Sequence, residues 1–332
     1  HLTNRELPYY YWQQYYTLMS NYGSYASYFI DTSTPFDQQM CMFDDTRTWQ
    51  QYFLQAAITN YENVTAIWQE ARLAGFQLSQ EDQDYLDELD GQITVAAASY
   101  SYGSADEYLQ MAYGPAATLT SYHAFVERQI TASAYLQVLV DEKPYTEDDI
   151  SKYYDDNADS YAGNGIEKSD VKMVNVRHIL IQPEGKNDDG TYTDEAWAEA
   201  EKKANDLLTE WQNGEHTEDS FAFMAAENSQ DPGSVENGGL YEDIYPGKMV
   251  DEFDAWCFDP ARQPGDTGIV KTSYGYHIMY FSSTGEHAYW YVRAEEDYLN
   301  ELSVSVLQEV AAKFEATESE QNAAIVDIMQ QN

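Results

Sequence analysis

The spacing of hydrophobic residues divides the chain into two helical regions that flank a region of strands. Between Thr48 and Gly75, apolar residues recur every three or four positions, as on the buried face of a helix, and Gly75 fits a helix C-cap. Between residues 171 and 283 short stretches alternate with a period of two, which is typical of strands. From His287 to Gln331 the spacing is helical again. We therefore predict helices at both ends of the chain and a sheet between them.

Further helix starts in the first region are marked by capping boxes. Three Ser or Thr residues each precede an acid by three positions, which predicts helices beginning near residues 80, 105 and 147: Ser79, Ser104 and Thr146. Gly114-Pro115 ends the second of these helices, and a longer helix is expected at residues 119–140. Residues 161–169, which include Ala-Gly-Asn-Gly, are expected to form a linker.

Two of the predicted strands carry a histidine. Strict alternation in residues 171–181 puts His178 on one strand face with Val176 and Leu180, and Ile179 on the other. His277 lies in a second strand that begins after Gly275. Two helices separate the strands, so this stretch forms an α+β unit of about 110 residues, a common domain size.

Composition excludes some functions and leaves others open. The chain has 17 basic and 58 acidic residues, a formal net charge of 17 − 58 = −41, which repels nucleic acid and anionic lipid. It also has 30 Tyr, whose rings can contact exposed apolar side chains while the hydroxyls stay hydrated. The sequence shows no signal peptide and no apolar run of transmembrane length.

Six short motifs in the strand region resemble, in order and spacing, those of the parvulin peptidyl-prolyl isomerases. They are Arg177-His178-Ile179-Leu180, Ser229-Gln230-Asp231, Asn237-Gly238-Gly239-Leu240, Gly247-Lys248-Met249 with Phe253, Gly265-Asp266, and Tyr274-Gly275-Tyr276-His277-Ile278. The flanking regions resemble those of the extracytoplasmic PrsA and SurA foldases. With both flanks, the resemblance covers most of the chain.

The resemblance implies an α+β fold in which a small parvulin-like domain is inserted in a mostly α-helical chaperone domain. The small domain would hold a four-stranded, mainly antiparallel sheet with flanking helices. We expect a helical domain at residues 1–168 and the parvulin-like domain at residues 169–284. Residues 285–332 should form a C-terminal helix that packs back on the helical domain, because a lone helix needs a surface for its apolar stripe.

The expected chemistry is rotation about X-Pro amide bonds, which needs no covalent step. The barrier is roughly 18–20 kcal/mol, and a catalyst must hold the proline ring and stabilise the twisted amide. By resemblance, the polar catalytic residues are His178, Asp231, Thr272 and His277, and the proline pocket is formed by Leu240, Met249 and Phe253, with Phe258 behind them.

Elementary chemistry limits how these groups can act. Two adjacent histidines share a hydrogen bond only if one donates and the other accepts, and Asp231 can orient the pair. Several parvulins carry a cysteine at the position of Asp231, so the acid excludes a thiolate nucleophile here. Met249 and Phe253 are four residues apart and would project together from one helical turn.

Substrate and location follow from the same resemblance. Phosphate-directed parvulins carry a basic cluster after the first strand, whereas residues 182–190 hold one Lys among three acids, so no phosphate preference is expected. The expected partners are unfolded or extended proline-containing polypeptides, without nucleic acid and with a possible homodimer. The expected location is extracytoplasmic, secreted or at the cell surface, with a membrane-anchored precursor.

Two alternatives stay open. The protein could be a holdase-type chaperone with a catalytically silent parvulin domain. It could instead use His178, His277 and Asp231 as a metal site, since two histidines and one carboxylate fit that formula. The apolar surroundings leave little room for further ligands, so no metal or cofactor is expected.

Overall fold

The computed structural model describes residues 2–3, 5–185 and 191–314, which form two compact units. One unit comprises the described residues up to Pro144 and those from Leu299 onward, and the other comprises Tyr145–Tyr298. The second unit is therefore inserted in the first along the chain. Within the described ranges, no helix is both long and apolar enough to cross a membrane.

The first unit is mostly helical. Its elements are α1 (Leu7–Tyr22), the 3₁₀ helix η1 (Gly23–Tyr28), a hairpin of β1 (Met40–Cys41) and β2 (Asp44–Thr48), α2 (Trp49–Ala74), α3 (Gln80–Ser99), α4 (Ala105–Tyr113) and α5 (Leu119–Asp141). The helix starts predicted near residues 80 and 105 are confirmed, because the side chains of Ser79 and Ser104 accept hydrogen bonds from the first turns of α3 and α4. Gly75 caps α2 in the left-handed conformation, as expected.

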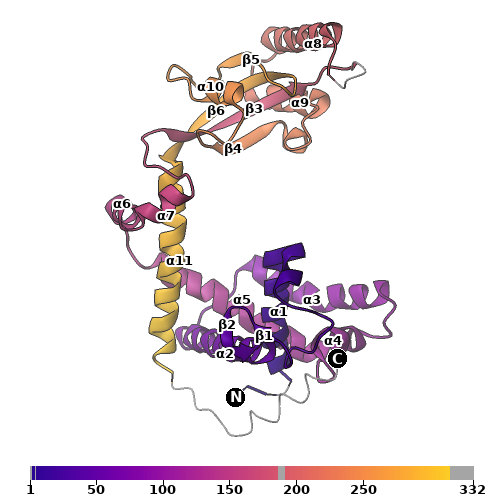
Figure 1. Ribbon diagram of the computed structural model, residues 1–332, viewed down its shortest axis with the longest axis vertical. Coiled ribbons are helices and arrows are strands. Elements are labelled where there is room, and N and C mark those ends of the chain that lie inside the picture. Colours follow the sequence, from indigo (N-terminus) through magenta and orange to yellow (C-terminus); the bar gives the residue numbers. More distant parts are fainter. Residues whose placement is uncertain (1, 4, 186–190, 315–332) are drawn as a thin grey trace. The chain divides into compact units, whose positions relative to one another are not determined.

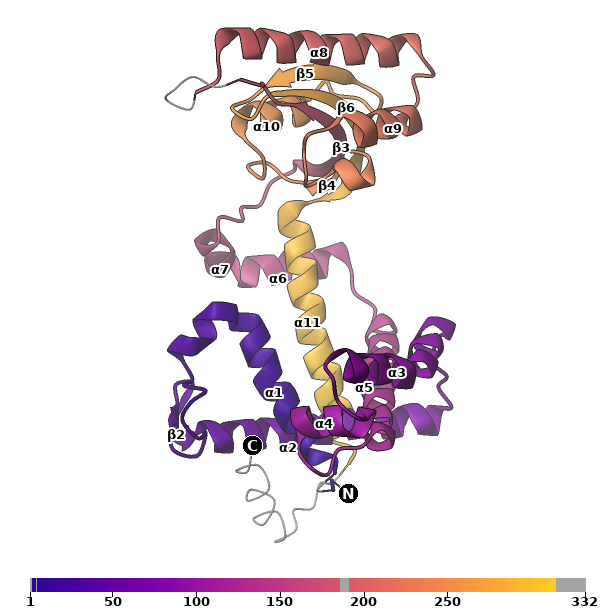
Figure 2. The ribbon, with the colours of Figure 1, turned by 90° about the vertical axis from the view of Figure 1, so that its right-hand side faces the viewer.

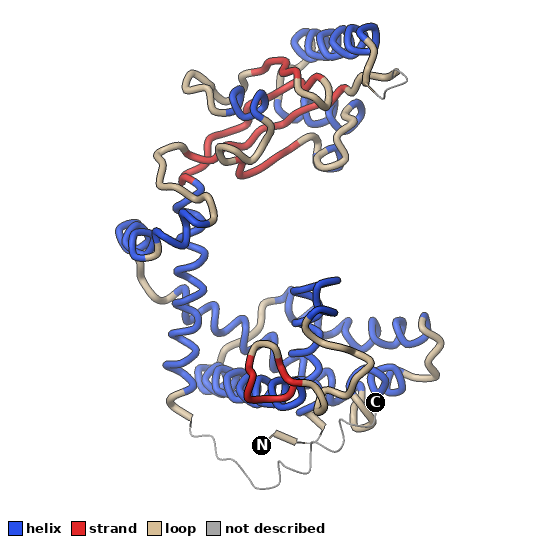
Figure 3. Tube along the Cα trace, in the orientation of Figure 1, coloured by secondary structure: helices blue, strands red, loops and turns tan. Residues whose placement is uncertain are grey.

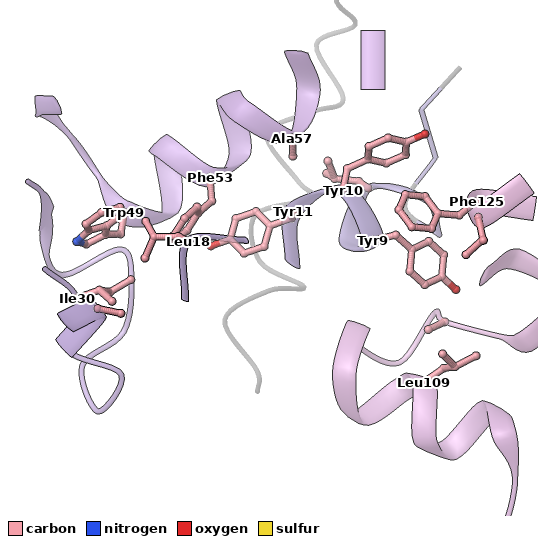
Figure 4. Packing of buried hydrophobic residues seen from close by; sticks show 14 of the residues in the cluster. Tyr9, Tyr10, Tyr11, Leu18, Ile30, Trp49, Phe53, Ala57, Leu109 and Phe125 are labelled. Atoms are coloured by element: carbon pink, nitrogen blue, oxygen red, sulfur yellow. The ribbon is translucent and has the colours of Figure 1, made fainter. Parts of the chain in front are cut away.

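The core of this unit is built from aromatic rings (Figure 4). Three consecutive residues of α1, Tyr9, Tyr10 and Tyr11, are all fully buried. Tyr9 and Tyr10 both pack against Phe125 of α5, whereas Tyr11 contacts Phe53 of α2. Neighbouring helices thus cover α1 on several sides, which explains why its aromatic residues do not follow a single helical stripe.

The second unit contains the larger sheet (Figures 1 and 3). Its elements are α6 (Glu147–Asp156), α7 (Ala158–Gly163), β3 (Lys172–Ile181), α8 (Asp194–Asn213), α9 (Glu218–Asn228), η2 (Val235–Asn237), β4 (Leu240–Ile244), α10 (Asp251–Cys257), β5 (Thr267–Lys271), β6 (Tyr276–Ala288) and the start of α11 (Tyr289–Ala311). The strand order is β4-β3-β6-β5, and every pair is antiparallel. The α+β fold with a four-stranded antiparallel sheet is confirmed.

Both faces of the sheet are covered, and α8 runs along one of them (Figure 2). Ile179 and Ile181 of β3 pack under α8 and α9, whereas Val174 and Val176 pack with α10. The alternation predicted for β3 is therefore confirmed. His178 belongs to the α10 side, where it contacts Phe253.

Three expectations differ from the structure. The linker expected at residues 161–169 begins instead after Gly163, because Tyr161 lies in α7 and stacks on Tyr154 with ring centroids 4.8 Å apart. The helix expected from His287 begins at Tyr289, since β6 continues to Ala288. Met249 precedes α10 and is not part of it, because Val250 is extended and the helix starts at Asp251.

The contact surfaces also bear on the expected domain limits. Helices α6 and α7 pack on the first part of α11 through a cluster that includes Tyr154, Tyr161 and Tyr291, so they belong to the inserted unit. Later residues of α11, including Val310, pack on Ile67 of α2. The limits at residues 168 and 284 stay a prediction. The final segment of the expected C-terminal helix and residues 186–190 of the loop after β3 lie outside the described residues.

Candidate functional site

His178 and His277 face each other from neighbouring strands. They lie on β3 and β6, are 2% and 6% exposed, and their Nδ1 atoms are 3.0 Å apart. The two strands can approach here because Gly275 takes φ +152°, and a Cβ at that position would lie 2.3 Å from the carbonyl oxygen of Ile181. The expected contact between the histidines is present.

The two histidines are the middle of a longer hydrogen-bonded chain. His178 Nε2 is 3.0 Å from Asp231 Oδ2, and His277 Nε2 is 2.9 Å from the hydroxyl of Thr272. An ionised Asp231 can only accept, so His178 donates from Nε2 and accepts at Nδ1. His277 then donates from Nδ1 and accepts at Nε2 from Thr272. The structure therefore brings together all four polar residues that the sequence indicated.

Asp231 has two further partners that sequence reasoning missed. The hydroxyls of Ser234 and Tyr241 lie 2.5 Å and 2.9 Å from Asp231 Oδ2, the same oxygen that faces His178. Ser234 follows Asp231 by three residues across an Asp-Pro-Gly-Ser turn, a spacing that could have suggested the contact. No comparable signal marks Tyr241.

The surroundings fix the charges of this chain. The hydrogen bond from His178, with those from Ser234 and Tyr241, holds the pKa of Asp231 well below its usual range, although partial burial opposes this. Burial and the neighbouring His178 lower the pKa of His277 to about 3. Burial and the bond to Asp231 raise the pKa of Tyr241 to about 12. Near neutral pH, the site thus holds an ionised carboxylate, a neutral His277 and a neutral phenol.

Apolar side chains lie beside the two imidazole rings. The ring of Phe253 meets both His178 and His277 edge-on, with centroids 5.4 Å apart in each case. Met249 and Phe258 are partly buried in the same cluster as Phe253. Leu240 is half-buried at the first residue of β4, where it pairs with Arg177. Three of the four expected pocket residues therefore share one cluster next to the polar chain.

The metal hypothesis can be tested against these contacts. Both ring nitrogens of His178 already have partners, His277 on one side and Asp231 on the other. A metal ion between the two rings would have to replace the hydrogen bond that joins them. No group of His, Cys, Asp and Glu with metal-binding geometry occurs in the described part of the chain. The arrangement favours a hydrogen-bonded chain.

The fold and this site define the class of the inserted unit. Residues 164–283 match the family model of the PPIC-type PPIASE domain. The chain therefore carries a parvulin-type peptidyl-prolyl isomerase domain.

Similar proteins extend the resemblance to the foldases. The chain is 31% identical over 106 residues to foldase protein PrsA 1 of Listeria innocua, which is 32% of this chain and 29% of that protein. It is 30% identical over 141 residues to foldase protein PrsA of Geobacillus kaustophilus, 42% and 37% of the two chains. Chaperone SurA of Pseudomonas savastanoi matches at 35% over 107 residues, 32% of this chain and 22% of that protein. The resemblance to PrsA and SurA is confirmed.

Each of these matches spans less than two thirds of the relative's length. Among solved structures, PrsA from Bacillus subtilis aligns with 88% of this chain and 99% of its own, at 17% identity and a TM-score of 0.37.

Proposed function

We propose that this protein is a peptidyl-prolyl cis/trans isomerase and foldase that acts on unfolded, proline-containing polypeptides outside the cytoplasm. The observation that carries the proposal is the hydrogen-bonded chain from Thr272 to Asp231, with Phe253 against both of its imidazoles, inside a PPIC-type domain. We assign catalysis to His178, Asp231, Thr272 and His277, and proline binding to Leu240, Met249, Phe253 and Phe258.

The geometry suits a reaction without covalent intermediates. Rotation about the X-Pro bond removes conjugation between the amide nitrogen and the carbonyl group, so charge shifts during the reaction while no bond breaks. Phe253 and its apolar neighbours exclude water from the planar amide and form an apolar surface on which the proline ring can bind. The fixed dipoles of the histidine chain then stabilise the twisted amide more strongly than mobile water would.

Thiol chemistry is not needed in this mechanism. Cys257, the one cysteine of the inserted unit, is buried, and burial raises the pKa of its thiol to about 12. Asp231 is ionised and accepts several hydrogen bonds, so it serves as an electrostatic group rather than a proton donor.

The proposal also covers the location of the protein and its binding partners. The similarity to PrsA and SurA supports an extracytoplasmic location, and we add to the proposal a precursor that is anchored at the membrane. The net charge of −41 attracts basic, unfolded segments and repels nucleic acid. It likewise disfavours a phosphorylated residue before proline, because that residue is also negatively charged. We include a homodimer as a further proposal, and sedimentation of the purified chain at several concentrations tests it.

The test is the isomerisation rate of short Ala-Pro and Phe-Pro peptides with the full chain. We expect acceleration over the spontaneous rate, and a fall of at least about tenfold for Asp231→Asn and for Phe253→Leu, because each removes a group that faces the imidazoles. Lys202→Gln, at an exposed position of α8, is the control and should keep the full rate. A folded full chain that leaves the spontaneous rate unchanged would refute the proposal.

A second candidate function, holding unfolded chains without catalysis, rests on an exposed apolar patch of the first unit. We call it the hairpin patch; its members lie on η1, the preceding residue and the β1–β2 hairpin: Tyr22, Tyr25, Tyr28, Met40, Met42 and Phe43. Tyr25 and Tyr28 are 68% and 75% exposed, and their rings stack on each other. Exposed apolar patches of this kind commonly mark interaction sites.

Aggregation assays separate this candidate from the first. If holding is the main function, Asp231→Asn should suppress aggregation of an unfolded client as well as the unchanged protein does. The double variant Tyr25→Ser/Tyr28→Ser should suppress it less, while Tyr100→Ser, at a 71% exposed tyrosine of α3's C-cap, serves as the matched control. Equal suppression by all variants would count against the hairpin patch.

A further inference from the structure

Strand β4 contains a bulge beside the site. Val174 pairs with Ile244 and Val176 pairs with Tyr241, so two steps along β3 oppose three steps along β4. Asp243 lies within the bulge and takes φ +52°, a left-handed conformation that Asp adopts more readily than most residues. A bulge of this kind redirects the side chains next to it.

The bulge is held in place from β3 and from the loop that follows β4. The backbone N–H of Asp243 donates to Asn175 Oδ1 at 2.8 Å, and Asn175 Nδ2 donates to Ser283 of β6. Lys248 donates from Nζ to the carbonyl oxygens of Glu242 and Asp243 at 3.2 Å and 3.1 Å. These contacts fix the bulge, so the direction of Tyr241 is set by the backbone.

Tyr241 makes two contacts with the polar chain. Its hydroxyl lies 2.9 Å from Asp231 Oδ2, and its ring stacks on His178 with centroids 5.2 Å apart and planes inclined by 23°. The rings of His178 and His277 have the same separation and inclination, and because their Nδ1 atoms are 3.0 Å apart they meet edge to edge. The imidazole of His178 therefore has Tyr241 against its ring, His277 at its Nδ1 edge and Phe253 edge-on.

The backbone leaves space for the phenol at one position. A Cβ added to Gly233 would lie 2.7 Å from the hydroxyl oxygen of Tyr241, closer than real contacts allow. Gly233 does not have the positive φ that would itself require glycine. The space at Gly233 is thus used by the tyrosine hydroxyl, which reaches Asp231 across it.

We propose that Tyr241 is a positioning residue of the isomerase site, whose hydroxyl holds Asp231 as an acceptor and whose ring holds His178 in line with His277. This inference rests on the proposed isomerase function. Tyr241 acts through Asp231 and His178 and sets the direction of donation along the chain. Without its hydroxyl, Asp231 keeps two of three donors and takes up a proton more readily.

A pH profile distinguishes this role from simple packing. The titratable groups that face Asp231 are His178 from β3 and Tyr241 from β4, with His277 of β6 beyond His178, while α10 contributes the uncharged Phe253. When Asp231 becomes protonated, His178 loses the acceptor that fixes its tautomer. The activity should fall as the pH is lowered, and this fall, the acid limb of the pH profile, should begin at a higher pH when the hydroxyl of Tyr241 is absent.

The experiment measures kcat/KM of the full chain on an Ala-Pro peptide from pH 8 down to the lowest pH at which both proteins stay folded, because the pKa of Asp231 lies well below its usual range. Tyr241→Phe should lower it about three- to tenfold at pH 7, since a bond to a charged acceptor is lost, and raise the acid limb by about half to one pH unit. Tyr280→Phe is the matched control: it removes a hydroxyl from the cluster on the opposite face of the sheet and should leave both quantities unchanged.

A second pair of variants tests the geometry itself. Gly233→Ala should lower kcat/KM at least as much as Tyr241→Phe, because the new methyl group displaces the hydroxyl. Adding Gly233→Ala to Tyr241→Phe should cost little more, since the clashing oxygen is already gone. Additive losses would overturn the inference.

The remaining outcomes separate the inference from the proposed function. An active wild type with a Tyr241→Phe variant of identical pH profile overturns the inference alone. A wild type without activity overturns the proposed function, and the positioning role with it. Loss of hydrogen-exchange protection in β3 and β6 of Tyr241→Phe would show a purely structural role and also overturn the inference.

Discussion

His178 and His277 meet through like atoms, since the Nδ1 of one ring lies 3.0 Å from the Nδ1 of the other. One ring must therefore donate while the other accepts. The ionised Asp231 accepts from Nε2 of His178, so His178 must accept at Nδ1 from His277. Donation therefore runs from Thr272 to His277, from His277 to His178, and from His178 to the carboxylate. Each member of the chain is buried or half-buried, so removal of one takes a hydrogen-bond partner from its neighbour in a place that water does not easily reach.

Thr272→Val tests the donor end of this chain. The substitution keeps the shape of the side chain but leaves Nε2 of His277 buried without its donor, which should cost about 1–3 kcal/mol. Hydrogen exchange of the β6 amides measures this cost in the inserted unit alone, which matters because a chain of two units need not unfold in one step. Thr267→Val, at the first residue of β5, is the control and should change exchange much less. Equal effects of both variants would contradict the assigned order.

The buried His277 predicts a loss of stability in acid. Its pKa is about 3 in the folded chain and 6.5 in the unfolded chain, so between these values the unfolded chain binds more protons. The contribution is complete above pH 6.5 and is lost as the pH falls towards 3, at no more than about 1.4 kcal/mol per pH unit. Asp231, whose folded pKa is also lowered, adds a loss of the same sign below about pH 4.

Hydrogen exchange of β3 and β6 at pH 7, 5.5 and 4, corrected for intrinsic rates, measures this dependence. His277→Asn removes the titrating group and should flatten the change between pH 6.5 and 4, whereas His216→Asn, in the loop before α9, should not. An unchanged slope in His277→Asn would show that other groups control the acid response.

Arg177 holds the Gly-Gly turn next to the site. Its Nε donates to Glu218 at 2.9 Å, and its Nη1 donates to the carbonyl oxygens of Asn237 and Gly238 at 3.0 Å. A lysine has the charge but lacks the planar fork, so Arg177→Lys should destabilise the inserted unit by about 1–3 kcal/mol. Exchange rates of the β4 amides measure this effect. Arg293→Lys, a partly exposed arginine of α11, is the matched control, and a similar change in both variants would argue against the turn contacts.

Local signals predicted much of the fold. The helix start near residue 147 follows from a capping box, and the Thr146 hydroxyl does accept from the N–H of Asp149. The alternation in β3 correctly separated His178 from Ile179. The four polar site residues came from the order of several motifs, since a single histidine on a strand face is more often structural.

Features that depend on distant contacts could not be predicted. Tyr241 reaches Asp231 because of a bulge that is fixed by Asn175, far away in the sequence. Met249 lies outside α10, where its backbone N–H and that of Gly247 are bound by Asp254, so a helical spacing was the wrong basis for pairing it with Phe253. A tertiary hydrogen bond overrides the local pattern at Tyr241, whereas at Met249 the Asp254 side chain binds the loop before the helix.

Two glycines with similar backbone conformations should respond differently to alanine. Gly239 has φ +76°, and a Cβ there would lie 2.2 Å from the carbonyl oxygen of His178, whereas Gly247 has φ +88° and open space around it. The conformational cost alone is about 1–2 kcal/mol. Gly247→Ala should therefore cost about that much, but Gly239→Ala should cost about 3 kcal/mol or more, because the backbone of β3 must move.

Hydrogen exchange across β3 and β4 checks this difference in the full chain. The carbonyl oxygen of Gly239 accepts a hydrogen bond from the N–H of His178 at 2.8 Å, and its N–H donates to the carbonyl oxygen of Ser234. Displacement of the turn would therefore disturb the backbone of both His178 and Ser234. We expect Gly239→Ala to lower exchange protection at His178 and Leu180 while Gly247→Ala leaves it intact. Equal losses in both variants would mean that φ alone governs these positions and that the close approach to His178 carries no energy of its own.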